Sequence, residues 1–292
     1  MRIVNLTSPV EARFGLKEGI RTLFRAGFEG VDLSFHPKET ELYSDDSAGL
    51  AKELLSIADE FGGAYTQAHA PFPTLRVGDD EEYIEYNRVT HEKIIRAIDF
   101  CGKVGVEHIV IHPIALAGAT DEEQLSFNLE HIGKYIPYAK DAGIKIAIEN
   151  MWGRHRDNNA KIVSNVCSFG EDLARYADAF NDPTVTVLLD VGHSGLVGDT
   201  ADHAIRAIGH RLCGLHIHDN DFLGDNHALP YLGKMDFDAI YRALAEVDYK
   251  GDITYETGFG KFPDALYGDA LSFMYKVGRY MASEIERYKN EK

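Results

Sequence analysis

Six short apolar runs of the chain end on a side chain that can bind a metal ion or move a proton. These side chains are His69, His112, Glu149, Asp190, His216 and Glu256. In the stretch LLDVGHSGL, for example, the apolar run stops at Asp190 and a histidine follows three residues later. Carboxylates and neutral imidazoles suit Zn²⁺, Mn²⁺, Fe²⁺ or Co²⁺, and a set without thiolates is typical of a catalytic rather than a structural zinc site. We therefore expect a catalytic divalent-metal site.

The elements that would position these side chains alternate between β-rich runs and longer amphipathic stretches. The runs are RIVNLT, GVDLSF, AYTQAH, HIVIHP, KIAIEN, VTVLLD, CGLHIH and DITYET. Eight strand–helix units predict an α/β protein with a (β/α)₈ TIM barrel, forming a single domain over residues 1–292. A doubly wound open sheet is the second choice, because neither GxGxxG nor GxxxxGK[ST] occurs in the chain.

In a TIM barrel the active site lies at the carboxyl ends of the strands. Alternation along a strand places residues two apart on one face, so five successive strands would point a metal-competent group inward. The pairs are Val110 with His112, Ala147 with Glu149, Leu188 with Asp190, Gly214 with His216, and Thr254 with Glu256. One such histidine or carboxylate is usually structural, but buried carboxylates that converge are costly unless they are paired or bind a cation.

The densest polar region follows the seventh run. His216 and His218 share a face, and Asp225 and His227 stand two apart in a loop between Gly224 and Pro230. Together with His193, which follows the sixth run, this loop is expected to form a second cluster of ligands.

The net charge, the cysteines and the apolar runs of the chain limit the classes of protein to which it could belong. The chain has 30 basic and 47 acidic residues, for a formal net charge of −17, which disfavours nucleic acid as a partner although it does not exclude a local basic groove. The three cysteines fit neither a disulfide framework nor a metal knuckle. No uninterrupted run of about 18 apolar residues occurs, so we expect a cytoplasmic protein that does not bind membranes.

The motifs QAHAPF, VIHP, IAIENM, LDVGH, HIHDND, GDNHALPYLGKMDF and YET occur in this order along the chain. In order and spacing the chain resembles the xylose isomerase-like TIM barrel superfamily, which includes sugar isomerases and epimerases and the endonuclease IV family. The resemblance implies that Glu149, Asp190, His216 and Glu256 bind one metal ion, and that the two glutamates also act as acid and base. It further implies that His69, His112, His193, Asp225 and His227 match the additional ligands of the endonuclease zinc cluster.

Several surrounding residues depart from the endonuclease pattern. LDVGH replaces a cysteine-containing motif, HIHDND places Asp221 where a cation would help to hold phosphate, and Phe72 replaces a tyrosine that probes duplex DNA. The basic residues that could contact DNA are scattered: Arg76, Lys103, Arg154, Arg156 and Lys234. These departures favour a sugar substrate.

The leading hypothesis is a divalent-metal-dependent isomerase or epimerase that acts on a small sugar, sugar phosphate or polyol-derived ketone through an enediolate. Glu149 and Glu256 would move the proton, and His193 would orient a substrate hydroxyl. The expected substrate contacts are His69, His112, Trp152, Arg154 and His218. Trp152 is equally well interpreted as a packing residue of the rim, and Arg154 more readily as part of a solvated loop.

Zinc or manganese is the expected metal, and magnesium, cobalt and iron are also compatible with the ligands. The alternatives are an abasic-site endonuclease of the endonuclease IV type and a polyol-ketone dehydratase. A binding protein without catalysis is disfavoured because both glutamates are present. The resemblance also suggests a homodimer, although no sequence feature indicates one.

Overall fold

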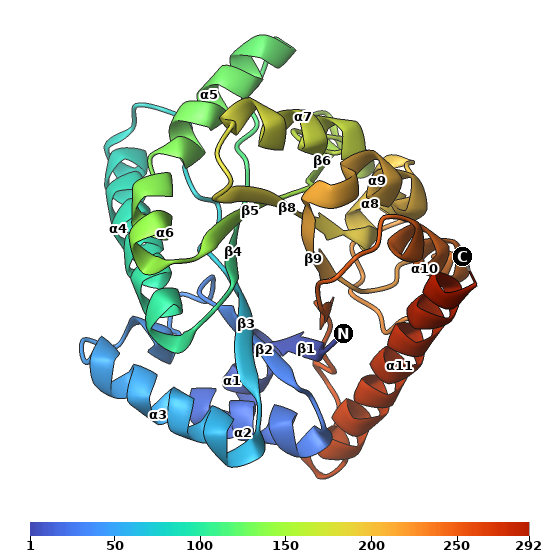
Figure 1. Cartoon of the computed structure of the whole chain (residues 1–292). Helices are drawn as coiled ribbons and strands as arrows, with labels where there is room; N and C mark the ends of the chain where they lie inside the picture. Colours follow the sequence, from blue (N-terminus) through green and yellow to red (C-terminus); the bar gives the residue numbers. More distant parts are fainter. Residues whose placement is uncertain (292) are drawn as a thin grey trace.

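The computed structural model describes residues 1–291 and, for residues 159 and 160, the backbone alone. The chain forms a single domain, and its centre is a barrel of eight parallel strands, as predicted (Figure 1). The strands are β1 (Ile3–Leu6), β2 (Gly30–Ser34), β3 (Ala64–His69), β4 (His108–Ile111), β5 (Lys145–Glu149), β8 (Val185–Asp190), β9 (Leu212–His216) and β10 (Ile253–Tyr255).

The strands pair in the order β10-β1-β2-β3-β4-β5-β8-β9. The barrel closes beyond the end of β9, where the backbone N–H of Ile217 donates to the carbonyl of Thr254 at 2.8 Å and that of Glu256 donates to the carbonyl of Ile217 at 3.2 Å. This closure brings the carboxyl ends of all eight strands to one rim.

Helices surround the barrel (Figure 1). They are α1 (Ser8–Phe14), α2 (Leu16–Ala26), α3 (Ser47–Phe61), α4 (Glu81–Val104), α5 (Asp121–Gly133), α6 (Ile136–Ala142), α7 (Gly170–Phe180), α8 (Val191–Val197), α9 (Ala201–Ile208), α10 (Phe237–Glu246) and α11 (Asp264–Asn290), with the short 3₁₀ helices η1 (Glu41–Tyr43) and η2 (Gly209–Arg211). Across the described residues, no helix combines the length and the apolar character that a membrane crossing requires.

Alternation along the strands divides the core into two layers. Side chains such as Ile109, Ile146 and Val187 point outward and pack in the large core beneath the helices. The residues between them point inward, and Val110, Ala147 and Leu188 form a small separate cluster inside the barrel. The inward face is the one that continues to His112, Glu149 and Asp190, because these lie two residues further along each strand.

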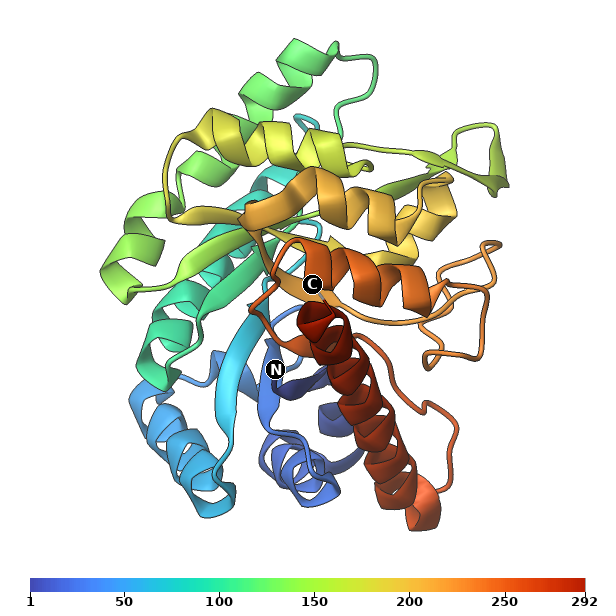
Figure 2. The ribbon, with the colours of Figure 1, turned by 45° about the vertical axis from the view of Figure 1, so that its right-hand side comes forward.

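One segment differs from its predicted form. Arg154 was interpreted as part of a solvated loop, but it lies in a β-hairpin of β6 (Trp152–His155) and β7 (Asn158–Ser164). Figure 2 shows this hairpin projecting from the barrel. It begins three residues after Glu149, so it forms part of the wall around the carboxyl-end rim.

Candidate metal centre

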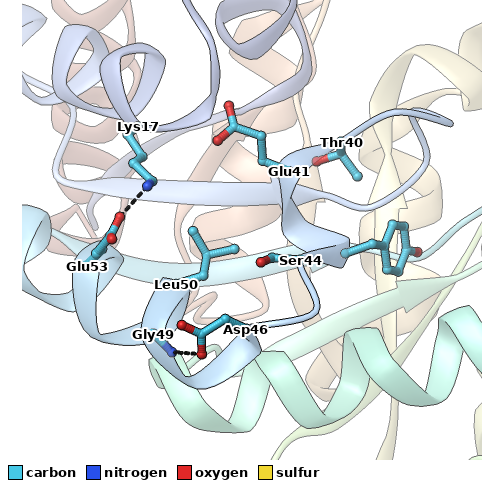
Figure 3. Close-up of a pocket in the computed structure, with 9 residues that line it drawn as sticks. Lys17, Thr40, Glu41, Ser44, Asp46, Gly49, Leu50 and Glu53 are labelled. Carbon is cyan, nitrogen blue, oxygen red and sulfur yellow. Dashed lines mark hydrogen bonds and ion pairs between the residues drawn. The ribbon is translucent and has the colours of Figure 1, made fainter.

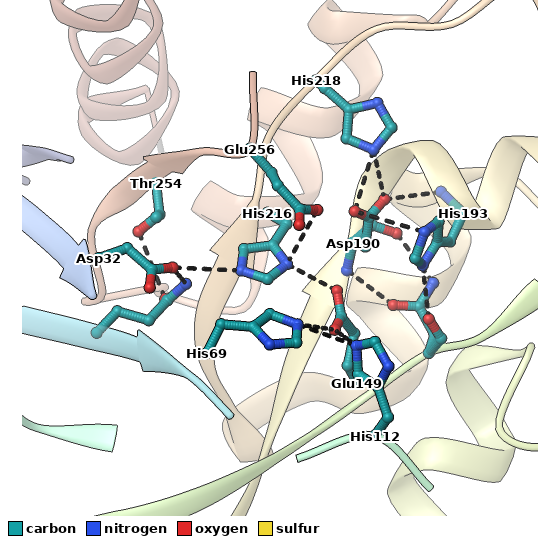
Figure 4. Close-up of polar contacts among 12 residues, drawn as sticks. Asp32, His69, His112, Glu149, Asp190, His193, His216, His218, Thr254 and Glu256 are labelled. Atoms are coloured by element: carbon teal, nitrogen blue, oxygen red, sulfur yellow. Dashed lines mark hydrogen bonds and ion pairs between the residues drawn. The ribbon is translucent and has the colours of Figure 1, made fainter. Parts of the chain in front are cut away.

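The structure brings the six strand-end groups together at the carboxyl rim (Figure 4). His69, Glu149, Asp190 and His216 are the last residues of β3, β5, β8 and β9. His112 and Glu256 each follow one residue after the end of their strand, β4 and β10. The six side chains form two groups of ligand atoms that share Glu149, and a third group, from the loop after β9, lies beside them.

The first group consists of Glu149, Asp190, His216 and Glu256, whose ligand atoms all lie within 4.8 Å of one another. Nδ1 of His216 lies 2.7 Å from Oε1 of Glu149 and 3.4 Å from Oε2 of Glu256. Three carboxylates and one imidazole nitrogen are a donor set that suits a divalent cation.

The second group consists of His69, His112 and Glu149. The two imidazole Nε2 atoms lie 3.0 Å apart, and that of His112 is 2.8 Å from Oε2 of Glu149. Nδ1 of His69 is 2.8 Å from the carbonyl oxygen of Ala70, to which it donates, so Nε2 of His69 faces the cluster. Glu149 therefore presents one carboxylate oxygen to each of the first two groups.

The third group consists of His218, Asp225 and His227. Nε2 of His227 is 3.0 Å from Oδ2 of Asp225, and the rings of His218 and His227 stack at 4.4 Å. His193 borders this group, with its Nε2 3.5 Å from Oδ2 of Asp225. Among the described residues, the buried Oδ1 of Asp225 and Nδ1 of His218 have no hydrogen-bond partner. Atoms of this kind in a cluster of N and O donors are compatible with a bound cation.

His218 was predicted to contact the substrate, but the structure places its ring against ligand candidates. Its Nε2 lies 3.0 Å from both carboxylate oxygens of Asp190, and the side chain is fully buried. Gly192 makes this approach feasible, because a Cβ atom there would lie 2.0 Å from Cε1 of His218. Gly192 lies within α8, whose N-cap is Asp190.

The ionisation of the first group is set by its own members. Burial opposes ionisation of Glu149, but His216 and hydrogen bonds from His112, His216 and His69 outweigh it and hold the pKa of this carboxyl well below its usual value. Burial, together with Glu149 and Asp190, raises the pKa of Glu256. Burial disfavours the imidazolium of His216, yet Glu256 and Glu149 raise its pKa well above the usual value.

The same balance holds for His193 and for His227 of the third group. Burial would lower the pKa of His193, but Asp190 and Asp225 raise it to about 10. Burial would also lower the pKa of His227, but Asp225 and Glu256 raise it to about 9. Without a cation, imidazolium protons thus balance the buried carboxylates. A divalent cation would replace these protons, since metal ligands bind in their deprotonated forms.

Two further residues predicted to contact the substrate lie on the hairpin. The ring of Trp152 is half-buried and lies 6.5 Å from that of His193. Arg154 is exposed, and its guanidinium lies 4.9 Å from the centroid of the Trp152 ring. Trp152 therefore borders the cluster, and Arg154 lies against Trp152.

A pocket of about 320 Å³ opens beside the first and third groups. It is lined by Leu6, Ser8, Pro9, His36, Phe72, His227, Glu256, Thr257 and Gly258. His36 was not among the predicted site residues, although it directly follows the second predicted strand. Its ring lies 5.4 Å from that of His69 and 5.1 Å from that of Phe72, and burial together with His69 lowers its pKa to about 3, so it is a neutral group.

A second hollow, of about 380 Å³, lies between α2, η1 and α3 (Figure 3). Several of its charged groups already have partners: Lys17 pairs with Glu53, and Asp46 accepts from the backbone N–H of Gly49 at 2.9 Å. None of the groups of metal-competent side chains among residues 1–291 includes a residue that lines it. The carboxyl-end rim is therefore the better candidate for chemistry.

Fold and site together define a member of a known family. The chain belongs to the xylose isomerase-like TIM barrel family, whose model matches residues 20–277. An uncharacterized protein from Sinorhizobium fredii is 26% identical over 94% of this chain and 93% of its own length. The ketose 3-epimerase of Arthrobacter globiformis is 24% identical over 93% of this chain and 86% of its own length.

Solved structures of epimerases share the fold. The structure of a D-tagatose 3-epimerase-like protein superimposes with a TM-score of 0.74 at 20% identity, covering 100% of this chain and 99% of that one. A D-psicose 3-epimerase gives a TM-score of 0.72 at 18% identity, covering 96% of this chain and 99% of that one. Proteins named as ketose 3-epimerases are thus among the distant relatives of this chain and among the structures that share its fold.

Proposed function

We propose that this protein is a divalent-metal-dependent epimerase that inverts a ketose at the carbon beside its carbonyl group. One observation carries the proposal. Glu149 on β5 and Glu256 after β10 reach the same nitrogen of His216 from strands that β8 and β9 separate. A substrate held between them would have one carboxyl group on each face of the carbon to be inverted.

The residues present fit a divalent cation. Glu149, Asp190, His216 and Glu256 would hold it, and His69, His112, His193, Asp225 and His227 would provide further ligands, with His218 beside the last two. A bound cation supplies Lewis acidity, which lowers the pKa of the C–H bond beside the carbonyl and stabilises the enediolate. Zinc and manganese remain the first candidates.

The chain's own residues would move the proton. Glu149, held ionised by its imidazole neighbours, is suited to remove the proton from one face. Glu256, whose pKa is raised, is suited to return a proton to the other face. The two roles exchange in the reverse reaction. His193 would orient a substrate hydroxyl, because its Nδ1 is fixed by donation to the carbonyl of Asn150 at 2.8 Å and its Nε2 faces the cluster.

The residues that line the pocket favour an uncharged sugar as the substrate. None of the residues that line it, all in the described part of the chain, is Lys or Arg. Two of the five scattered cations that could contact DNA are paired with acids, Arg76 with Glu82 at 3.1 Å and Lys103 with Asp99 at 2.6 Å. A ketose without a phosphate group agrees with this lining better than a sugar phosphate or an abasic DNA duplex.

The chain is first stripped of metal with a chelator and then loaded with Mn²⁺ or Co²⁺. It is assayed on D-fructose, D-tagatose, D-psicose and L-ribulose. We expect conversion of at least one ketose to its C3 epimer, with loss of turnover on chelation and in Glu256→Gln. Failure with every ketose, together with chelator-sensitive nicking of a duplex carrying one abasic site, would identify an endonuclease instead. Release of water from a polyol-derived ketone would identify a dehydratase.

A further inference from the structure

A chain of buried polar side chains leads from His216 into the interior of the barrel, away from the ligand cluster. Asp32 on β2 has Oδ2 3.5 Å from Nε2 of His216. The same oxygen accepts a hydrogen bond of 2.6 Å from the amide nitrogen of Gln67 on β3. Oε1 of Gln67 in turn lies 2.9 Å from Nε2 of His108, the first residue of β4. Figure 4 shows Asp32 and His216 facing each other, with Thr254 nearby.

The direction of these hydrogen bonds follows from the chemistry of the groups. An amide nitrogen only donates and an ionised carboxylate only accepts, so Gln67 donates to Asp32 and its oxygen accepts from His108 and, at 3.5 Å, from Thr254. Oδ2 of Asp32 lies 3.5 Å from Nε2 of His216 and can only accept, so this contact favours a hydrogen on Nε2. The lone pair of the neutral imidazole then lies on Nδ1, the atom that faces Glu149 and Glu256.

This layer of the barrel is closely packed. Asp32 and Gln67 are each 1% exposed. A Cβ atom added at Gly214 would lie 2.6 Å from Nε2 of His108 and 2.9 Å from Oε1 of Gln67. Among the described residues, Oδ1 of Asp32 is buried without a hydrogen-bond partner. A buried carboxylate with one unpartnered oxygen costs stability, so apolar residues would fill this layer better if packing were its only role.

We propose that Asp32 is a positioning residue for His216: it holds Nε2 protonated and turns Nδ1 toward the ligand cluster, while Gln67, fixed by His108, holds Asp32 in place. The inference rests on the metal site of the proposed function. In metal sites generally, loss of such a partner to a ligating histidine weakens metal binding or activity by about 10- to 100-fold.

The first measurement is the dissociation constant for Mn²⁺, obtained by competition with a chromophoric chelator. Asp32→Asn keeps the shape of the side chain and removes its charge, and Asp32→Leu also removes the acceptor. We expect affinity to fall by about 10-fold in the first and by up to about 100-fold in the second. Gln67→Met should weaken binding less. The control is Thr66→Val, next to Gln67 on β3, because the buried hydroxyl of Thr66 has no hydrogen-bond partner among the described residues.

The second measurement reads the imidazole directly. In the Zn²⁺-loaded chain with ¹⁵N-labelled histidine, long-range ¹H–¹⁵N spectra should show His216 with hydrogen on Nε2, and Asp32→Leu should broaden or shift that signal. Equal Mn²⁺ affinity in wild type, Asp32→Asn and Asp32→Leu would overturn the inference. Affinity that depends on Asp32 in a chain that epimerises no ketose would support the inference and contradict the proposed function. A wild-type chain that binds no Mn²⁺ would overturn both.

Discussion

Nδ1 of His216 and Oε1 of Glu149 lie 2.7 Å apart at the carboxyl end of the barrel, while the other oxygen of Glu149 lies 2.8 Å from Nε2 of His112. One carboxylate thus joins the first two ligand groups. Substitutions at Glu149 should therefore affect both groups at once, whereas substitutions at most other positions should affect one.

Glu149→Gln should reduce kcat on the ketose substrate by on the order of 10²- to 10⁴-fold, the range typical for loss of a general acid or base. It should also lower the metal content of the purified chain. The matched control is Glu107→Gln, because Glu107 directly precedes β4, at the other end of the barrel, and pairs with Arg2 at the surface. Wild-type turnover in Glu149→Gln, at an unchanged circular dichroism spectrum, would remove Glu149 from the mechanism.

The stability of the chelated chain should fall as pH rises. The pKa values of His193 and His227, raised to about 10 and about 9, exceed the value of about 6.5 expected in the unfolded chain. Protonation of these histidines therefore stabilises the fold fully below about pH 6.5, and this contribution is lost as pH rises toward 9 and 10. Thermal unfolding of the EDTA-treated chain from pH 6 to pH 10 measures the effect.

The metal-loaded chain provides the comparison for that experiment. Metal affinity rises as ligand protons leave, so added Mn²⁺ should raise the unfolding temperature more at pH 8 than at pH 6. An unfolding temperature of the chelated chain that stays level or rises between pH 7 and pH 10 would show that the buried histidines do not balance the carboxylates as the geometry indicates.

In a chain that holds a second cation at His218, Asp225 and His227, His218→Asn should reduce the bound metal by about one equivalent per chain, measured by elemental analysis after dialysis. The group of Glu149, Asp190, His216 and Glu256 should keep its metal, although His218 also contacts Asp190. An unchanged metal content with a raised KM would instead support the role in substrate binding that the sequence predicted for His218.

Phe72→Ala should raise KM for the ketose about 2- to 12-fold, with little change in kcat, since one aromatic contact contributes about 0.5–1.5 kcal/mol. Phe72 lines the pocket and its ring stacks on that of His112 at 5.0 Å. The control is Phe273→Ala, an exposed phenylalanine on α11 outside the pocket. An equal change of KM in both variants would show that Phe72 does not contact the sugar.

The eight barrel strands could be predicted because parallel strands covered on both faces read as short continuous apolar runs. The convergence of His69, Glu149, Asp190 and His216 followed from the same pattern, since each ends a strand. The hairpin at residues 152–164 could not be recognised in this way. It is short and polar, and its strands lack the alternation of a half-buried sheet, so its pairing appears only in three dimensions.

Asp32 and Gln67 were missed for a different reason. Both lie inside predicted strands rather than at their ends, and a polar residue there is equally compatible with the barrel's interior and its exterior. Their contact depends on register, because an irregularity between Val31 and Asp32 sets Asp32 opposite Gln67. His36 could have been predicted, since it lies two residues beyond the end of β2, close to the carboxyl-end rim.

Proton exchange at C3 of the ketose tests the proposed epimerase chemistry directly. The Mn²⁺-loaded chain is incubated with D-psicose or D-tagatose in D₂O, and the recovered sugars are examined by NMR. We expect deuterium at C3 of the epimer, and loss of this incorporation in Glu149→Gln. Epimer formed without solvent deuterium, or no exchange with any ketose by a chain that demonstrably holds metal, would contradict this chemistry.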